Sequence, residues 1–169
     1  MALKEKALKR LCEKMSRAGI PFCVAGPWML CQKGWNQPWH SFDIVVERDQ
    51  YEAADRVLTR LGMRTPVFES AQACETHYHF DGADIQLYAG FPLPDAVYRL
   101  PAEAEKITVL SQEVPLLTAE DWFVLLRLSG RNADAEAMQS FFQTQPFRTD
   151  ALSSPLSAFA PQGDAFPIQ

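Results

Sequence analysis

Apolar residues near the N-terminus recur at helical spacing, and two short apolar runs follow them. Charged residues of this first segment lie between five apolar positions, Leu3, Ala7, Leu8, Leu11 and Met15. This spacing predicts an amphipathic helix that ends near Gly19. The runs IPFCVAG and SFDIVVE each indicate a buried strand. Between them, Gly26-Pro27 favours the start of a short helix, because proline is tolerated at the first helical position.

A third helix is predicted directly after the second strand. Asp49 and Glu52 have the spacing of a capping box, in which two side chains satisfy free backbone amides at a helix start. The apolar face of this helix ends before Gly62 and consists of Tyr51, Ala54, Val57, Leu58 and Leu61.

The middle of the chain has the alternating pattern of a β-hairpin. The segments TPVFES and CETHYHF indicate strands, and Asp81-Gly82 is a two-residue turn signal that leads into a further strand, ADIQLYAGF. Three prolines then mark a loop, at Pro92, Pro94 and Pro101.

The C-terminal third returns to helical spacing after one more strand or strand pair, KITVLSQEVPLL. Thr118 is placed to cap a helix AEDWFVLLRL, which Gly130 separates from ADAEAMQSFF. From Pro146 onward the chain holds four prolines without periodicity, which indicates an extended or mobile tail. We therefore predict an α/β fold, a short mixed sheet flanked by helices with C-terminal helices, in one domain over 1–145 and a tail over 146–169.

Composition narrows the classes of partner. The chain has 169 residues, 47% of them apolar and 22% charged, which is the balance of one globular domain. A formal net charge of -5 with no basic block argues against a nucleic-acid partner and against an anionic membrane surface. Without an apolar run of bilayer length we expect a cytoplasmic protein, and four cysteines without a CxxC pair predict buried, reduced thiols.

Two aspartates are the first candidates for chemistry. Alternate residues of a strand share a face, so Asp43 points to the same side as Ser41, and Asp84 to the same side as Gln86 and Tyr88. On neighbouring strands, Asp43 and Asp84 could converge on one divalent cation, which prefers hard oxygen ligands. The alternative is that both are structural residues at strand ends, and Glu47, four residues beyond Asp43, fits a solvated strand end better than a substitute ligand.

Histidines and tryptophans offer further candidates. His77 and His79 share a strand face and could form a zinc site with His40, or they could be the polar face of the hairpin with His40 in a loop. Three tryptophans surround the same region and could stack on the ring of a ligand. Core packing is favoured for Trp28, and a pocket or an interface for Trp35 and Trp39.

The order of these parts resembles the nucleotidyltransferase superfamily of the DNA polymerase β type, and especially small bacterial members similar to aminoglycoside and lincosamide adenylyltransferases. Those proteins have a strand ending in Gly-Gly or Gly-Ser, a short helix, a loop with His or Arg, and a strand with Asp-x-Asp. The segment from AGIPFCVAGPW to HSFDIVVE follows this pattern, GADIQLY resembles the strand with the third carboxylate, and LLTAEDWFVLLRLSGRNAD resembles the helix with a downstream Arg-x-x-Asp, here Arg131 and Asp134. The resemblance covers about residues 5 to 142.

The resemblance implies a set of site residues and two departures from the pattern. Asp43 and Asp84 would be the catalytic and metal-binding carboxylates, with weakly held Mg²⁺ or Mn²⁺ as the cofactor. Ser41 stands at the first aspartate of Asp-x-Asp, where a neutral hydroxyl is a far poorer metal ligand. Pro27 stands at the second small residue and offers no N–H to a phosphate. The implied nucleotide-binding residues are Gly26, Pro27, Trp28, His40 and Ser41.

These departures favour a divergent, catalytically impaired nucleotidyltransferase-like protein that binds a nucleotide or small molecule. Two alternatives stay open: an active transferase that moves a nucleotidyl group to a small hydroxylated acceptor, and a non-enzymatic interaction module that uses the tail or the tryptophan loop. Nucleotide-dependent thermal stabilisation separates the first two from the third.

Overall fold

The computed structural model describes residues 2–154 and 156–161. Its order is that of an α/β protein, as predicted, and the elements run along the chain as follows: α1 (Ala2–Arg17), β1 (Cys23–Ala25), α2 (Gly26–Gln32), β2 (Ser41–Val46), α3 (Tyr51–Thr59), β3 (Met63–Glu69), β4 (Cys74–Phe80), β5 (Ala83–Ala89), β6 (Pro92–Leu93), β7 (Ala96–Val97), β8 (Glu105–Val109), β9 (Gln112–Leu116), α4 (Ala119–Leu128), α5 (Asn132–Ala137) and α6 (Gln139–Thr144). Short 3-10 turns occur at Arg48–Gln50, Thr149–Ala151 and Leu156–Phe159.

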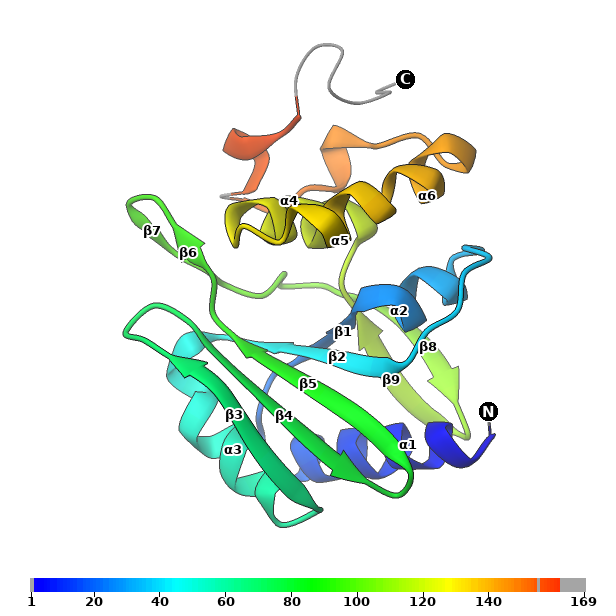
Figure 1. Cartoon of the computed structure of the whole chain (residues 1–169), viewed down its shortest axis with the longest axis vertical. Coiled ribbons are helices and arrows are strands. Elements are labelled where there is room, and N and C mark those ends of the chain that lie inside the picture. The colour runs from blue at the N-terminus through cyan, green and yellow to red at the C-terminus, as the bar shows by residue number, and fades with distance from the viewer. Residues whose placement is uncertain (1, 155, 162–169) are drawn as a thin grey trace.

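Seven strands form one mixed sheet in the order β3-β4-β5-β2-β1-β9-β8. Two pairs are parallel, β2 with β5 and β1 with β9, and the other neighbours are antiparallel. Figure 1 shows α1 and α3 together at one end of the molecule and α4, α5 and α6 at the other. The predicted mixed sheet with flanking helices is therefore confirmed.

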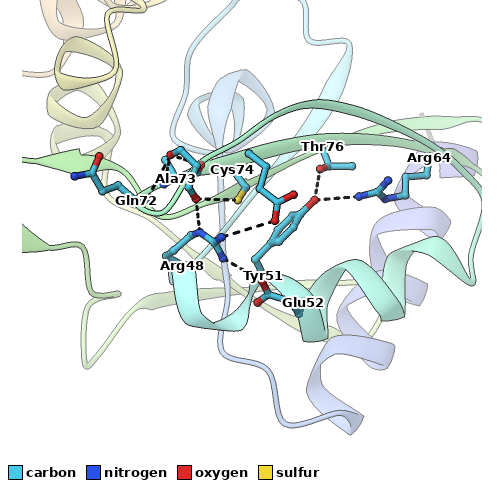
Figure 2. A network of polar contacts seen from close by, with 10 residues as sticks. Arg48, Tyr51, Glu52, Arg64, Gln72, Ala73, Cys74 and Thr76 are labelled. Atoms are coloured by element: carbon cyan, nitrogen blue, oxygen red, sulfur yellow. Dashed lines mark hydrogen bonds and ion pairs between the residues drawn. The ribbon is translucent and has the colours of Figure 1, made fainter.

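The two faces of the sheet differ in chemistry because side chains alternate along each strand. One face is apolar and lies under α3, with Phe42, Ile44, Ile85 and Leu87 fully buried. Polar contacts fix α3 against this face: the Tyr51 hydroxyl lies 2.7 Å from Thr76 Oγ1 and accepts a hydrogen bond from Arg64 (Figure 2). The opposite face is rich in polar side chains and holds the candidate site.

Local turn and cap signals are confirmed at two positions. Asp81 and Gly82 both have positive φ, 52° and 74°, which is the left-handed geometry of a tight hairpin turn between β4 and β5. Thr118 Oγ1 accepts a hydrogen bond from the Asp121 N–H at 3.0 Å and so caps α4. KITVLSQEVPLL forms the pair β8 and β9.

The predicted capping box of α3 is wrong. A 3-10 turn precedes α3, and neither helix start has a side-chain cap. Both side chains are engaged elsewhere, since Asp49 accepts from Arg99 at 3.3 Å and Glu52 from Arg48 at 3.3 Å. The proline loop also contains a two-stranded ribbon, β6 with β7, that its prolines did not indicate.

The described part of the predicted tail packs on α4. The Arg148 N–H donates to Glu120 at 3.0 Å, the Ser153 N–H donates to Asp121 Oδ1 at 2.8 Å, and Phe147 is fully buried. Residues 162–169 lie outside the described residues, and the boundary at 145 stays a prediction. Among the described helices, none combines the length and apolarity needed to cross a bilayer. The four cysteines are free, three of them buried.

Candidate functional site

A cavity of about 260 Å³ opens on the polar face of the sheet, between the strand ends, the loop before β2 and helices α4 and α5. We call it the Asp43 cavity. Its wall brings together residues from widely separated parts of the chain, among them Pro27, Trp35, Trp39, His40, Ser41, Asp43, Gln86, Trp122, Leu126, Arg131 and Asp134.

Gly26 and Asp43 are in close contact because β1 and β2 are antiparallel neighbours with Ala25 opposite Asp43. A Cβ atom on Gly26 would lie 2.2 Å from Asp43 Oδ2, and the Gly26 φ of 77° is itself left-handed. The glycine therefore provides the space that the aspartate carboxyl group fills. It also leaves Asp43 only 5% exposed.

Burial raises the pKa of Asp43 to about 7. Two contacts favour the charged form and limit that rise: the Ser41 hydroxyl donates to Asp43 Oδ1 at 3.1 Å, and the Arg131 guanidinium attracts the carboxylate. The neighbouring carboxylates of Asp134 and Glu75 act in the opposite direction. Asp43 can thus be protonated or charged near neutral pH.

Asp84 lies on the strand next to Asp43, but not in the same cavity. In the parallel register of β2 and β5, Asp84 is opposite Ser41 and Gln86 is opposite Asp43, so all four share the polar face. The Asp84 side chain is 65% exposed and hydrogen-bonded to His79 Nδ1 at 2.7 Å. The residue beside Asp43 in the cavity wall is Gln86.

The donors that line the Asp43 cavity do not fit a two-metal centre. Within the described residues, no three His, Cys, Asp or Glu side chains are grouped so that they could hold one ion. Asp43 has the neutral oxygens of Ser41 and Gln86 as its neighbours on the strands, and neutral oxygens are weaker ligands for Mg²⁺ or Mn²⁺ than carboxylates. A single cation held by Asp43 and Asp84 stays a prediction.

Arg131 is the cation of the cavity wall, and a polar network holds it at the N-terminus of α5. Its Nε donates to Asp134 at 2.9 Å, its guanidinium donates to the Tyr88 hydroxyl and covers the Tyr88 ring, and it lies 3.6 Å from Glu75. Burial raises the pKa of Tyr88, so its hydroxyl stays protonated and donates to Gln86 Oε1 at 2.7 Å. The network links Arg131 to the strand positions beside Asp43.

The tryptophans divide between core and cavity. Trp28 is 1% exposed, stacks edge-on against Phe42 at 5.5 Å and does not line the cavity. Trp35 and Trp39 do line it, and the Trp35 indole N–H donates to Ser140 on α6 at 2.9 Å. The loop before β2 is therefore held against the C-terminal helices.

The histidines and Glu47 lie in other surroundings. His40 lines the cavity at an exposed position, whereas His77 bonds Glu75 and His79 bonds Asp84, each at 2.7 Å. These partners do not form a three-histidine zinc cluster in the part of the chain that is described. Glu47 accepts from Arg99 and from the Leu100 N–H, each at 2.9 Å, and so anchors the loop after β7.

Sequence reasoning named Arg131 and Asp134 through the family resemblance but missed Glu75 and Trp122. Glu75 had a signal in the strand alternation, because it lies two residues from His77 on the same face. Gln86 and Tyr88 were noted as sharing the strand face of Asp84, but not as the partners of Asp43 and Arg131. Trp122 had no signal, since an aromatic residue in an apolar helix is typical of a core.

The comparisons with known proteins find similarity in structure. No protein-family model matches the chain, and no curated protein matches it significantly. The fold is similar to a candidate nucleotidyltransferase of Thermotoga maritima, with a TM-score of 0.56 and 16% identity over 83% of this chain and 92% of that one. It is similar to the lincosamide antibiotic adenylyltransferase LnuA, solved with lincomycin, with a TM-score of 0.53 and 15% identity over 82% and 98% of the two chains. It is also similar to ANT(2")-Ia, solved with adenylyl-2"-tobramycin, with a TM-score of 0.50 and 12% identity over 88% and 98%. The chain has a nucleotidyltransferase-like fold.

Proposed function

We propose that this protein binds a nucleotide or a related small molecule in the Asp43 cavity and transfers a nucleotidyl group poorly or not at all. One observation carries the proposal. In a nucleotidyltransferase-like fold, a buried carboxylate in the cavity is flanked by the neutral side chains of Ser41 and Gln86 on the paired strands.

The wall of the cavity supports binding of a phosphorylated, ring-bearing ligand. Arg131 provides a fixed cation, because Asp134 and Tyr88 hold its guanidinium in place, and a guanidinium suits phosphate oxygens. Trp35 and Trp39 provide aromatic surface at the other side, and aromatic rings stack on bases. Asp43, when charged, could contribute to holding the cation that accompanies a nucleotide.

The same wall supports impaired transfer. Phosphoryl transfer asks the protein chiefly for positioning and for neutralisation of the charge that develops on the phosphoryl oxygens. Ser41 contributes no charge where a bridging carboxylate is expected, and Pro27, in the first turn of α2, contributes no backbone donor. The cavity therefore has groups that can position a nucleotide but lacks two of the groups that would help to neutralise the charge on the phosphoryl oxygens.

An active transferase is the second candidate, and the strand register favours it over an interaction module. Asp84 lies opposite Ser41 on a parallel neighbour, so a rotation of its exposed side chain away from His79 would bring a second carboxylate toward the cation. A transferase of this kind would move a nucleotidyl group to a small hydroxylated acceptor and release pyrophosphate.

The test is thermal unfolding of the purified chain with ATP or GTP and Mn²⁺, followed by an assay for pyrophosphate release. A nucleotide at ten times its Kd should add about 1.4 kcal/mol to the free energy of unfolding, and Arg131→Gln should remove most of this gain. Arg99→Gln removes an exposed arginine that is bonded to Glu47 away from the cavity, so this control should keep the gain.

Three outcomes are informative. Stabilisation without pyrophosphate release supports the proposal. Stabilisation with steady release in the presence of a small alcohol supports the active transferase. If neither nucleotide shifts the unfolding curve of the wild type, the Asp43 cavity is not a nucleotide site, and the interaction module becomes the better description.

A further inference from the structure

A second cavity, of about 210 Å³, adjoins the Asp43 cavity on the polar face of the sheet. Trp122, Leu126 and Arg131 line both, so α4 and the start of α5 form a common wall. We call the second one the Phe91 cavity. Its lining is mainly apolar and includes Ala73, Cys74, Tyr88, Phe91, Trp122 and Leu126.

The charges at the Phe91 cavity are paired with one another. Glu75 and Arg131 are the charged residues among those described in its lining, and they lie 3.6 Å apart. Glu75 also bonds His77 at 2.7 Å, and Arg131 donates to Asp134 at 2.9 Å. A ligand with its own net charge would have to compete with these partners, whereas an uncharged one would leave them intact.

The wall near Ala73 is held by backbone contacts before any ligand binds. The Ser70 hydroxyl and N–H both bond the Ala73 carbonyl at 2.9 Å, and Arg48 Nε donates to the Ser70 carbonyl at 2.9 Å (Figure 2). Gly90 lies close to this segment: a Cβ atom on Gly90 would be 2.5 Å from the Gln72 carbonyl oxygen. The Gly90 φ of 76° is also left-handed. The cavity is thus a preformed feature of the fold, which lowers the ordering cost of binding.

We propose that the Phe91 cavity binds the uncharged ring system of a second small molecule, beside the nucleotide of the Asp43 cavity. The proposal rests on the proposed function, which supplies the nucleotide. Three features carry it: the shared wall, the apolar lining and the paired charges. The volume of about 210 Å³ lies below the range of about 300–1,000 Å³ that is typical of pockets for drug-sized ligands, so the bound ring system must be small.

The same features exclude a polycationic second ligand. Each ammonium group of an amine-rich molecule such as tobramycin must replace its lost hydration, which requires a carboxylate that is free to pair with it. Glu75 already has two partners, so it does not meet this requirement. The class of ligand that fits is a neutral molecule built on an aromatic or alicyclic ring.

The experiment uses the full chain, with 2-naphthol as the neutral ring probe and tobramycin as the cationic one, each titrated by calorimetry. Ala73→Phe places a ring inside the cavity, and Ala71→Phe adds the same ring two residues earlier, at an exposed position that does not line the cavity. We expect 2-naphthol to bind the wild type and the Ala71 variant alike, and Ala73→Phe to weaken binding at least about tenfold. Tobramycin should bind none of them measurably.

A second filling variant, Ser129→Leu, serves if Ala73→Phe does not fold, because Ser129 lines the cavity from the end of α4. Equal binding of 2-naphthol by the wild type and both filling variants, no binding by the wild type, or tighter binding of tobramycin would each overturn the proposal. ATP-dependent stabilisation measured on the same samples separates the two inferences. If ATP stabilises the chain and 2-naphthol does not bind, the Phe91 proposal alone has failed.

Discussion

Asp43 and Asp84 lie on the same face of paired strands, two residues out of register, yet their surroundings differ completely. Asp43 is 5% exposed as a residue and lies beneath Gly26 and beside Ser41, whereas the Asp84 side chain is 65% exposed and bonded to His79. The difference follows from what covers each strand position. The loop before β2 and the helices α4 and α5 cover the position of Asp43, while Asp84 lies at the open start of β5. An aspartate on this face is therefore a candidate for chemistry only where other segments cover it and exclude water from its carboxyl group.

The largest effect is expected from filling the space beside the Asp43 carboxyl group. Gly26→Ala should destabilise the protein by about 5 kcal/mol, because the new Cβ atom would overlap the Asp43 carboxyl group and a left-handed φ is strained for alanine. Gly19→Ala is a matched control, since Gly19 has a φ of 71° but no atom within 4 Å of an added Cβ.

Denaturant unfolding of both variants measures the clash apart from the strain. The control should lose about 1–2 kcal/mol. Asp43→Ala in the Gly26→Ala background should restore part of the loss, since it removes two of the three overlapping atoms. Equal losses for the two glycine variants would mean that the contact with Asp43 carries no energy.

The pH dependence of stability tests the buried state of Asp43 directly. A carboxyl group whose pKa rises from 3.8 in the unfolded chain to about 7 in the folded one binds its proton more tightly when folded. Its contribution is therefore complete below pH 3.8 and is lost as the pH rises through 7. The wild type should lose about 4 kcal/mol over this window that Asp43→Asn does not lose.

The measurement is the difference in the free energy of urea unfolding between the wild type and Asp43→Asn at pH 4, 5, 6, 7 and 8. Taking this difference cancels the contributions of the other carboxylates. Asp84→Asn is the matched control, because it removes an exposed carboxylate from the same face of the sheet. A difference between wild type and Asp43→Asn that does not change with pH would show that Asp43 titrates as an ordinary exposed aspartate.

Ser41→Asp adds a carboxylate next to both Asp43 and Asp84. Position 41 shares a strand with Asp43 and is the register partner of Asp84, so the new carboxylate would lie between them. Repulsion should lower the stability of the metal-free variant by about 1–2 kcal/mol, and millimolar Mn²⁺ should restore it. Melting temperatures with and without Mn²⁺ test this, with Ser157→Asp as a control that adds the same charge at an exposed, distant position. No gain with Mn²⁺ for Ser41→Asp would identify Asp43 as a structural residue.

The smallest effect is expected at the open end of β5. Asp84→Asn should change the free energy of unfolding by less than about 0.5 kcal/mol at pH 7, because exposed ion pairs such as Asp84–His79 contribute little. A loss comparable to that of a buried residue, measured by denaturant unfolding, would remove the distinction between the two aspartates.

Local patterns predicted much of the fold. Periodicity located α1, β1, β2 and α3, the Asp81-Gly82 signal placed the β4–β5 turn, and Thr118 capped α4. Each of these signals involves only a few consecutive residues, so it can be recognised from the sequence alone. The capping box at Asp49 failed because two arginines engage its side chains: the adjacent Arg48 bonds Glu52, and Arg99 reaches Asp49 from a distant loop.

The site was predicted less completely, because the burial of a side chain and the register between strands both depend on segments that are distant in the sequence. The alternation placed Asp43 beside Ser41 on one face, and the structure agrees. The sequence also favoured the core for Trp28, but it gave no means to see that Gln86 lies opposite Asp43 or that Phe42 is the ring against Trp28. The Phe91 cavity had no signal, since β4, β5, α4 and α5 contribute to it jointly.

The sequence by itself determined most of the strands and helices, that Ser41 and Asp43 share a face, and that a glycine stands at the start of α2. Those properties depend on backbone preferences and side-chain spacing within one element. The tertiary structure alone decided that Gly26 lies against Asp43, that Asp84 is opposite Ser41, and that Arg131 reaches Tyr88 from 43 positions away. The physical reason is that burial and charge act through space: the pKa of Asp43 is raised by atoms that only folding brings around it.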